Sequence, residues 1–499
     1  MQQPTRRVAV LRLSGDISTK SNQTRKWFTA RLVSNIRAGL RLNGIDFELV
    51  KKRDRIFVYS QDPKLGPVLS RVFGVAGVGI AEPHTYETLD DVVQKGLELF
   101  SDKVVGRTFA VRSRRCGEKS AIPFMAIDLD QRLGGALYPL AKGVDLKSPE
   151  FKVQIEVHET FAYHYVEPEY PGNGGLPLGV QDRALCLISG GFDSAVAAWQ
   201  MMRRGVALDF VFFNLAGAEQ VRGVRRVLQK LLQNWGYGHE AKLLIVDLRP
   251  AVGQLKLDIK GTYWQVVLKR LMARAADLIA QQQRYAALLT GEALGQVSTQ
   301  ALATMAPIAT GIKTPILRPL VGFNKDEIIK LSKHVGTHDI SAKNPEFCAL
   351  GGGRPVTKIA TWLLDKLEAE ITGIPELVAE AQTLDFETLL QDPEDVGVGV
   401  NHIPDGAAVI DLRSDVAYSS WHFPGSANLP FDVAVKNALR LPKDRAYVFY
   451  CEVGLKSASL AERLHELGYE AYNFDGALRG LMRWAAEHRL GEANPVDEF

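Results

Sequence analysis

The stretch Ser189-Gly-Gly-Phe-Asp-Ser194 lies directly between an apolar segment, 184–188, and a helical segment, 195–204. A strand, a glycine-rich turn and a helix in this order bring backbone N–H groups and the positive end of a helix to one place, which suits a phosphate group. Its two serines can donate hydrogen bonds to phosphate oxygens, and Asp193 could hold a magnesium ion. A simple turn in which Ser194 or Asp193 caps the helix is the alternative. The GxxxxGK[ST] pattern of kinases is absent.

Apolar segments continue on the C-terminal side of this loop, and helical segments such as 221–235 separate them. Their expected ranges are 184–188, 208–213, 242–246 and 286–290. Continuous apolar strands that alternate with helices indicate a parallel sheet covered on both faces. A Gly- and Pro-rich stretch, 170–179, precedes this α/β region.

The two ends of the chain show other patterns. In the first 165 residues, strands and helices alternate as in α+β domains. The expected strands there are 8–13, 47–51, 55–59, 108–114, 151–158 and 161–165, and the expected helices are 25–42 and 89–100. The C-terminal end reads as one more α/β unit. Its expected strands are 408–411 and 446–450, and its expected helix is 457–467. The sequence therefore predicts a multidomain α+β and α/β protein.

Charge is distributed unevenly along the 499 residues, whose net charge is +3. Residues 1–55 contain thirteen Lys or Arg and four Asp or Glu, whereas residues 371–400 contain seven acids and no Lys or Arg. A basic front end favours a polyanionic partner, because each neutralised phosphate releases counterions. A solvated basic face is the alternative interpretation.

Composition also argues against several classes of protein. No apolar run approaches the roughly 18 residues of a membrane-spanning helix, and the start of the chain lacks the apolar region of a secretory signal. We therefore expect a cytoplasmic protein with no membrane partner. Four cysteines are too few for a disulfide scaffold and form no CxxC pair. Since the ten histidines do not cluster either, we predict no protein-bound transition metal.

Cys451 follows the expected strand 446–450 and opens the loop Cys451-Glu-Val-Gly-Leu-Lys-Ser457 before a helix. Backbone N–H groups at a helix N-terminus stabilise a thiolate or persulfide. A buried structural cysteine at a strand end is the alternative. We expect Cys186, within a strand, to be a core residue and Cys116 to lie in a surface loop.

Six segments in one order resemble those of a known family. Ser189–Ser194 is similar to the pyrophosphate loop of the ATP pyrophosphatase superfamily. The other five are Phe212-Phe-Asn214, Val267-Leu-Lys-Arg270, Thr290–Gln300, Leu317-Arg-Pro-Leu320 and Asn344-Pro-Glu-Phe-Cys348. Together they resemble the tRNA 4-thiouridine synthetases, sulfurtransferases that are also tied to thiazole synthesis. The resemblance covers nearly the whole chain.

This resemblance implies a domain order. We expect a ferredoxin-like domain at 1–70, a THUMP RNA-binding domain at 71–170 and an ATP pyrophosphatase domain at 176–375. A linker at 376–400 and a rhodanese-like domain at 401–499 would follow.

The resemblance also implies roles for single residues. Asp193, Lys325, Cys348 and Cys451 would be catalytic, and the two cysteines would form a disulfide during turnover. Taken by itself, Lys325 reads as a surface residue near the start of a helix. The residues expected to bind the nucleotide are Leu187, Ile188, Ser189, Gly190, Gly191, Ser194, Phe212, Phe213, Lys269, Gly291 and Gln300. From its position alone, Lys269 could equally be a solvated charge on a helix.

The implied reaction is ATP-dependent sulfur transfer to uridine 8 of tRNA, with magnesium arriving with ATP. A cysteine desulfurase would supply the persulfide, and a sulfur-carrier protein of thiazole synthesis is a further expected partner. Arg112, Arg114 and Arg115 would hold tRNA by its phosphates, and a homodimer is left open. Two alternatives stay open: an RNA-binding sulfur-relay adaptor, and an ATP-dependent amide-forming ligase.

Overall fold

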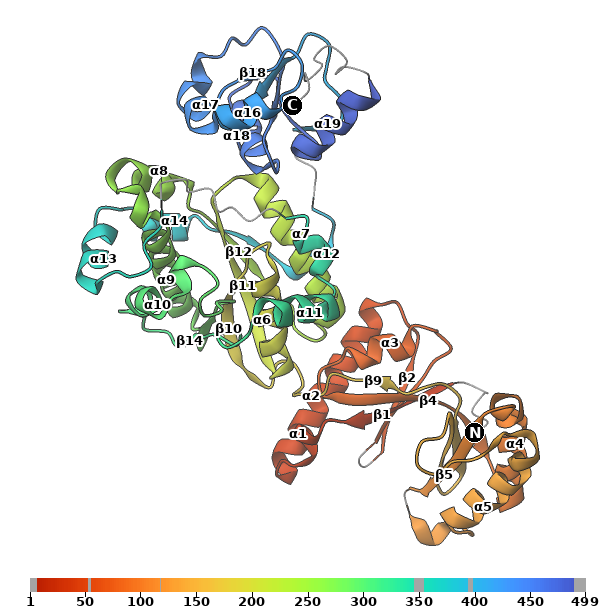
Figure 1. Ribbon diagram of the computed structural model, residues 1–499. Coiled ribbons are helices and arrows are strands. Elements are labelled where there is room, and N and C mark those ends of the chain that lie inside the picture. Colours follow the sequence, from red (N-terminus) through yellow and green to blue (C-terminus); the bar gives the residue numbers. More distant parts are fainter. Residues whose placement is uncertain (1–6, 53–54, 117, 345–353, 394–397, 489–499) are drawn as a thin grey trace. The chain divides into compact units, whose positions relative to one another are not determined.

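The computed structural model describes residues 7–52, 55–116, 118–344, 354–393 and 398–488 (Figure 1). The chain divides into two compact units. The first extends to Gln181 and includes two short later segments, 202–206 and 237–239, and the second holds the remaining residues.

A nine-stranded sheet forms the first unit, with the order β2-β3-β1-β4-β8-β7-β5-β6 and with β9 paired to β4. Its strands are β1 (Val8–Leu13), β2 (Glu48–Lys52), β3 (Arg55–Tyr59), β4 (Val75–Thr85), β5 (Thr108–Arg115), β6 (Gly143–Val144), β7 (Phe151–Val157), β8 (Phe161–Tyr165) and β9 (Tyr170–Pro171). Its longer helices are α2 (Asn22–Leu42), α3 (Leu65–Ser70), α4 (Leu89–Val104) and α5 (Ala126–Leu137), and α1 (Gly15–Ser18) is a single turn.

Strand β4 joins the two halves of this sheet. Its first part pairs with β1 and its last part, from Ala81, pairs with β8. The domain boundary expected at residue 70 thus falls just before a strand that belongs to both halves. Helices α2 and α3 pack on one half through Leu32, Ile36 and Leu69, all fully buried. Helices α4 and α5 pack on the other half in a second core.

The second unit contains a six-stranded sheet with the order β14-β13-β10-β11-β12-β15. Its strands are β10 (Gln181–Leu187), β11 (Val206–Asn214), β12 (Leu243–Asp247), β13 (Ala287–Leu289), β14 (Ile316–Leu317) and β15 (Gln382–Leu384). Its helices are α6 (Phe192–Arg203), α7 (Ala218–Trp235), α8 (Arg249–Asp258), α9 (Trp264–Gln283), α10 (Leu302–Ala309), α11 (Lys325–Val335), α12 (His338–Ser341), α13 (Thr361–Glu368), α14 (Ile374–Ala379) and α15 (Phe386–Leu390).

The acidic region expected to be a linker contributes to this sheet. β15 pairs antiparallel with β12, Leu384 lying opposite Leu243. The α15 helix is tied to α7, since Arg225 donates to the Thr388 carbonyl at 3.1 Å and Gln229 to the Leu390 carbonyl at 3.0 Å. Apolar side chains such as Leu389, which is fully buried, outweigh the acidic composition of the segment.

Five parallel strands form a separate sheet near the end of the chain, with the order β16-β20-β19-β17-β18. They are β16 (Gly399–Val400), β17 (Ala408–Asp411), β18 (Ala427–Asn428), β19 (Tyr447–Tyr450) and β20 (Ala471–Phe474). The helices around them are α16 (Asp415–Ser420), α17 (Phe431–Asn437), α18 (Leu455–Glu466) and α19 (Ala477–Glu487). Separate apolar cores line the two faces of this sheet. The expected combination of α+β and α/β folds is confirmed.

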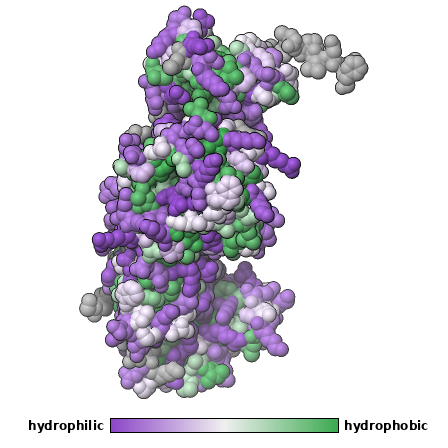
Figure 2. All heavy atoms as spheres, turned by 90° about the vertical axis from the view of Figure 1, so that its left-hand side faces the viewer, coloured by the Kyte–Doolittle hydropathy of each residue, from purple (hydrophilic) through white to green (hydrophobic). Residues whose placement is uncertain are grey.

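Hydrophilic and hydrophobic residues are interspersed on the face that Figure 2 shows. Among the described residues, no helix combines the length and the apolar character needed to cross a bilayer.

Candidate nucleotide and sulfur-transfer site

The loop Ser189–Ser194 follows β10, the strand at which the strand order of the six-stranded sheet reverses. From β10 the chain adds β11 and β12 on one side and then crosses to β13 on the other side. In open α/β sheets, ligands bind beyond the carboxyl ends of the strands at such a point. The loop follows β10 there, and Thr290 follows β13, since the parallel register aligns Cys186 with Leu289. Leu187 and Ile188, expected to bind the nucleotide, lie at the end of β10 at this edge.

The two serines of the loop bond to each other. Ser194 Oγ accepts a hydrogen bond from the Ser189 backbone N–H at 3.0 Å and lies 3.0 Å from Ser189 Oγ. The Gly191 N–H donates to Ser189 Oγ at 3.4 Å. Ser194 is only 5% exposed. These serines therefore shape the loop, and its remaining N–H groups and the start of α6 are the part suited to an anion.

Gly291 packs directly against the loop. A Cβ atom at this position would lie 2.7 Å from both the Asp193 carbonyl carbon and the Ser194 nitrogen. Backbone atoms cannot yield as a flexible side chain can. Glycine is therefore required where the segment after β13 crosses the start of α6.

Asp193 and Lys325 form an ion pair at this edge. The Lys325 Nζ lies 2.9 Å from Asp193 Oδ1, and it lies 5.5 Å from the centre of the Phe192 ring. Lys325 is the first residue of α11, whose N-cap, Asn324, accepts a hydrogen bond from the Glu327 N–H at 3.0 Å. Although 132 residues separate the pair in sequence, the fold brings these two predicted catalytic side chains together.

Two phenylalanines that we expected to bind the nucleotide are largely buried. Phe212 is 3% exposed and Phe213 is 6% exposed, both within β11. Phe213 belongs to the main apolar core. Their side chains support the strand, and the edge beside the loop is formed by the end of β11 at Asn214.

Lys269 and Gln300 lie on two segments that are joined by a hydrogen bond. Ser298 Oγ donates to Gln265 Oε1 at 3.1 Å, and Lys269 is four residues after Gln265 on α9, which places both on one helix face. Lys269 is exposed, which fits both a phosphate contact and a solvated charge on the helix. Gln300 Oε1 is buried without a hydrogen-bond partner in the described structure. A buried acceptor without a partner fits a ligand that brings a hydrogen-bond donor.

Asn344 contacts the loop. It lies in one of the six similar segments, but no role was predicted for it from the sequence. Its Nδ2 donates to the Gly223 carbonyl at 2.9 Å and lies 3.4 Å from the Gly190 carbonyl. It thereby links the loop to α7. Asn344 opens the segment Asn344–Cys348, and Cys348 itself lies outside the described residues.

Arg318 and Glu292 form a second ion pair at the strand ends. Arg318 Nε donates to Glu292 Oε2 at 2.7 Å, and Thr290 Oγ1 donates to the same oxygen at 3.0 Å. This pair links the segment after β14 to that after β13. Sequence spacing alone contains no signal for it.

Cys451 lies in a closed cradle between β19 and α18. The residue is fully buried. The Gly454 N–H donates to its Sγ at 3.2 Å, and Ser457 Oγ donates to it at 3.4 Å. Donors aimed at sulfur stabilise its anionic form. The structure therefore supports the predicted loop geometry, in which the start of a helix surrounds the sulfur.

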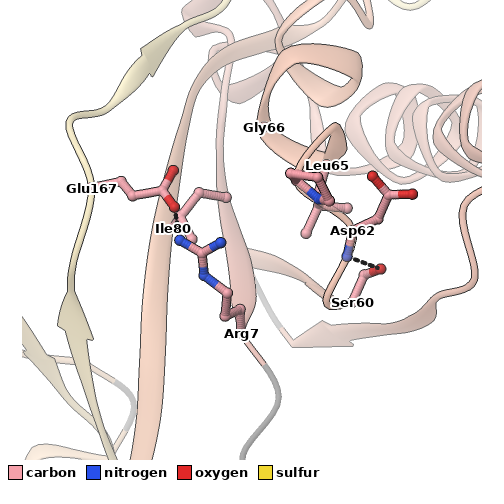
Figure 3. A pocket seen from close by; sticks show the side chains of 8 residues that line it. Arg7, Ser60, Asp62, Leu65, Gly66, Ile80 and Glu167 are labelled. Carbon is pink, nitrogen blue, oxygen red and sulfur yellow. Dashed lines mark hydrogen bonds and ion pairs between the residues drawn. The ribbon is translucent and has the colours of Figure 1, made fainter.

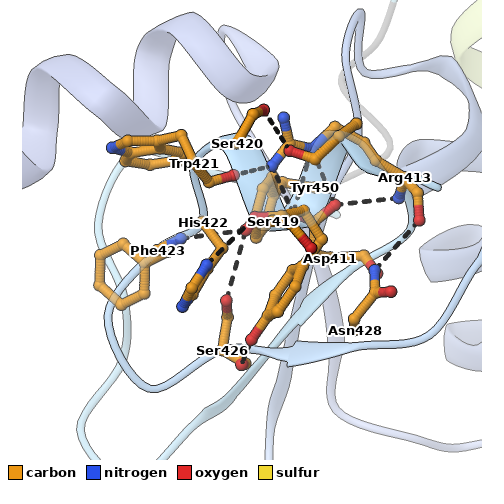
Figure 4. Close-up of polar contacts among 12 residues, drawn as sticks. Asp411, Arg413, Ser419, Ser420, Trp421, His422, Phe423, Ser426, Asn428 and Tyr450 are labelled. Carbon is orange, nitrogen blue, oxygen red and sulfur yellow. Dashed lines mark hydrogen bonds and ion pairs between the residues drawn. The ribbon is translucent and has the colours of Figure 1, made fainter. Parts of the chain in front are cut away.

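A buried polar network holds the strand that leads to Cys451 (Figure 4). Asp411 and Arg413 pair through two hydrogen bonds from Arg413 Nε, at 2.9 and 3.0 Å. The Tyr450 hydroxyl accepts from the Phe423 N–H at 3.1 Å. Burial raises the pKa of Tyr450 to about 12, so its phenol stays neutral. These contacts fix the end of β19 next to the sulfur.

The three arginines predicted to bind RNA do not share one face of β5. Side chains alternate along a strand, so Arg112 and Arg114 lie on one face and Arg115 on the other. Arg112 is exposed and also donates to the Leu146 carbonyl. Arg114 Nε donates to Glu156 Oε1 at 2.9 Å, and Arg115 donates to the Phe124 carbonyl at 3.2 Å.

Glu156 is the centre of a buried ion cluster. Arg55 of β3 lies 3.1 Å from Oε1, the same oxygen that Arg114 contacts. Burial by itself raises the pKa of Glu156, but His158 and the two arginines outweigh it and lower the pKa to about 2. Cys116 and His158 also offer ligand atoms within 4.8 Å of this carboxylate. Two guanidinium groups on one carboxylate already supply the positive charge that a metal would bring.

A small hollow lies elsewhere in the first unit (Figure 3). Arg7 pairs with Glu167 at its edge. The Asp62 N–H donates to Ser60 Oγ at 3.3 Å, and Ser60 donates to the Asp46 carbonyl at 2.6 Å. Its polar groups thus bond among themselves, and we assign it no ligand.

Four family models match successive parts of the chain. The ThiI ferredoxin-like domain matches residues 9–79 and the THUMP domain residues 86–167. The model described as Thiamine biosynthesis protein (ThiI) matches residues 179–372, and the rhodanese-like domain matches residues 399–486. Both the nucleotide loop and the cysteine cradle fall within matched regions.

Similar proteins extend over nearly the whole chain. A tRNA sulfurtransferase of Pyrobaculum aerophilum is 36% identical over 93% of this chain and 96% of its own length. One of Marinobacter nauticus is 32% identical over 92% and 97%. A crystal structure described as a 4-thiouridine synthetase–RNA complex with bound ATP is 27% identical, has a TM-score of 0.67, and covers 76% of this chain and 99% of its own. The chain belongs to the tRNA sulfurtransferase family.

Proposed function

We propose that this protein uses ATP to convert uridine 8 of tRNA to 4-thiouridine, with sulfur carried on Cys451. The observation that carries the proposal is that one chain holds both an anion-binding loop at the reversal point of an α/β sheet and a cysteine surrounded by donors. A similar crystal structure, described as a complex with RNA and bound ATP, supports nucleotide and tRNA as the ligands.

The loop and its neighbours would bind ATP. The Gly190 N–H and the start of α6 would donate to the phosphates, Lys269 would neutralise phosphate charge, and Gln300 would contact the nucleotide through its unpaired oxygen. Asp193 and Lys325 would orient the reacting phosphate. Magnesium, held by ATP and Asp193, would neutralise the leaving pyrophosphate. The uridine O4 would thereby receive AMP, which makes it a better leaving group.

Sulfur transfer completes the proposed reaction. The terminal sulfur of a persulfide on Cys451 passes to uridine C4, AMP leaves with O4, and the Cys348 thiol becomes joined to Cys451 as a disulfide. A thiol reductant then returns two electrons to this disulfide. A cysteine desulfurase would load Cys451, and the same persulfide could serve a sulfur-carrier protein of thiazole synthesis.

The basic first unit would hold tRNA. Arg112 is the best placed of the three predicted arginines, because it is exposed, whereas Arg114 pairs with the buried Glu156 and Arg115 is half-buried. Such a contact reads phosphate position and RNA shape, with little dependence on base sequence.

Pyrophosphate release tests this function. The purified chain is incubated with ATP in the presence and absence of tRNA, with and without a desulfurase and cysteine. We expect release that depends on tRNA and 4-thiouridine that depends on the desulfurase. Release without tRNA would favour an amide-forming ligase, and no release at all would favour a relay adaptor.

A further inference from the structure

The hydroxyl of Ser457 lies among three acceptors in the cradle of Cys451. Ser457 Oγ is 2.6 Å from Asn473 Oδ1, 3.1 Å from the Gly454 carbonyl oxygen and 3.4 Å from Cys451 Sγ. A serine hydroxyl carries one proton and donates fully to one acceptor at a time. The acceptor that it chooses must therefore depend on the state of the sulfur.

Asn473 is held rigidly beside this hydroxyl. It lies on β20, where its register partner on β19 is Phe449, two residues before Cys451. Its backbone N–H donates to the Val398 carbonyl at 2.7 Å. Ser457 and Cys451 are both fully buried. Water therefore does not reach Ser457 Oγ or Cys451 Sγ, so no solvent molecule can replace the hydroxyl as a donor to the sulfur, whereas Asn473 is only partly buried.

We propose that Asn473 is a positioning residue that competes with Cys451 for the Ser457 proton, so that Ser457 donates to Asn473 while the sulfur is neutral and turns to the sulfur when it is anionic. The inference rests on the proposed role of Cys451 as the sulfur carrier. A neutral thiol is a weak acceptor, whereas a hydrogen bond to an ionised group is about twice as strong as a neutral one. The charge on sulfur therefore decides where the proton points.

This arrangement gives the two residues opposite effects. Asn473 stabilises the idle thiol, because it offers the better acceptor in that state. Ser457 stabilises the thiolate and the persulfide anion. The Gly454 N–H donates to the sulfur at 3.2 Å and needs no rearrangement. The thiol form of Cys451 is thus kept less reactive, and its persulfide anion is stabilised.

Alkylation of Cys451 in the full-length protein tests the competition. Iodoacetamide is added at one neutral pH, and the modified Cys451 peptide is followed by mass spectrometry. We expect Asn473→Ala to speed alkylation and Ser457→Ala to slow it, each by roughly threefold to tenfold, the range of one hydrogen bond. Asn473→Ala should change nothing further in a Ser457→Ala background. The charged loop residues Glu452 and Lys456 stay unchanged in all variants.

A second variant guards against a folding defect. Asn473→Asp keeps the acceptor and strengthens it, so alkylation should be slower than in the unaltered protein, with amide exchange across β19 and β20 preserved. Slower alkylation in Asn473→Ala would overturn the competition, because it would mean that Asn473 only holds Ser457 toward the sulfur. An equal effect of Asn473→Ala with and without Ser457 would also overturn it.

Persulfide loading is measured separately with a desulfurase and labelled cysteine, using Cys451→Ser as the blank. Absence of label on Cys451 in the unaltered protein would refute the carrier role. The alkylation rates would still report on Asn473, so the two failures are distinguishable.

Discussion

The Nζ of Lys325 lies 2.9 Å from Oδ1 of Asp193, so the first residue of α11 meets the loop that follows β10. Both side chains retain access to solvent, with 43% and 20% of their surface exposed. An ion pair of this kind contributes little to stability. On the proposed function, its position at the predicted phosphate site would let the pair orient a ligand.

Asp193→Ala should therefore abolish adenylation of tRNA and leave persulfide loading of Cys451 intact. The reason is that Asp193 belongs to the nucleotide loop and not to the cysteine cradle. Transfer of labelled AMP and loading with labelled sulfur would be measured on one preparation. The matched control is Asp326→Ala, which removes an exposed acid next to Lys325 in the first turn of α11. Normal adenylation in Asp193→Ala would remove Asp193 from the mechanism.

Gly291→Ala should raise the KM for ATP at least tenfold. The added Cβ would meet backbone atoms of Asp193 and Ser194 at 2.7 Å, which displaces the loop. Gly253→Ala serves as the control, because nothing lies within 4 Å of a Cβ there in α8, and alanine favours a helix by about 1 kcal/mol. Equal KM values for the two variants would show that the loop tolerates the displacement.

Arg112→Ala should weaken tRNA binding and flatten the dependence of log affinity on log salt by up to ~0.9 per lost phosphate contact. Binding of ATP should stay the same, since the nucleotide loop belongs to another sheet. Arg115→Ala tests the opposite face of β5. The face whose variant keeps the original slope is the one that does not contact RNA, and two unchanged slopes would contradict an RNA-binding role for β5.

Acid should destabilise the first unit, because it protonates Glu156. Its folded-state pKa of about 2 lies below the ordinary 4.5, so the ion cluster stabilises the fold above pH 4.5 and is lost as the pH falls toward 2. The full effect is about 3 kcal/mol. Amide exchange in β5 and β7 should accelerate over this range, and Glu156→Gln should remove the pH dependence. Glu98→Gln, on an exposed pair with Lys95, should retain it.

Variants of the four cysteines should differ in the reaction step at which they fail. Cys451→Ala should fail to accept sulfur from the desulfurase, whereas Cys348→Ala should accept it and fail to complete thiolation. Cys116→Ala and Cys186→Ala should stay active, because burial raises the pKa of both thiols and keeps them unreactive. After one turnover without reductant, mass spectrometry should find a Cys348–Cys451 disulfide. A free Cys348 beside stoichiometric 4-thiouridine would contradict this pairing.

Strands with strong apolar character could be predicted to the residue. The ranges 8–13, 55–59 and 408–411 agree with β1, β3 and β17. Strand β4 was not predicted, because its two glycines and its proline are residues that strands usually lack. One of these glycines is required by a distant residue: a Cβ on Gly79 would lie 2.2 Å from the Tyr165 ring. Such a requirement comes from tertiary packing and leaves no local pattern.

The candidate site was also predicted only in part, because its loops are local in sequence and their partners are not. The loop Ser189–Ser194 and the cradle that opens at Cys451 are continuous in sequence, and the expected strand–loop–helix order is found at both. The partners of these loops come from afar: Lys325 reaches Asp193, Asn344 reaches Gly190, and Asn473 reaches Ser457. Resemblance pointed to the first of these partners. The other two depend on how separate elements pack.

The complete burial of Cys451 has a consequence for the lifetime of the sulfur that it would carry. A persulfide in solution is soon discharged by any small thiol that diffuses to it. Inside this cradle an attacking molecule would first have to gain access, so burial would protect the carried sulfur in addition to the hydrogen bonds that Cys451 accepts. On the proposed function, delivery would then favour a partner that can reach the buried sulfur, and other thiols would remove the sulfur only slowly.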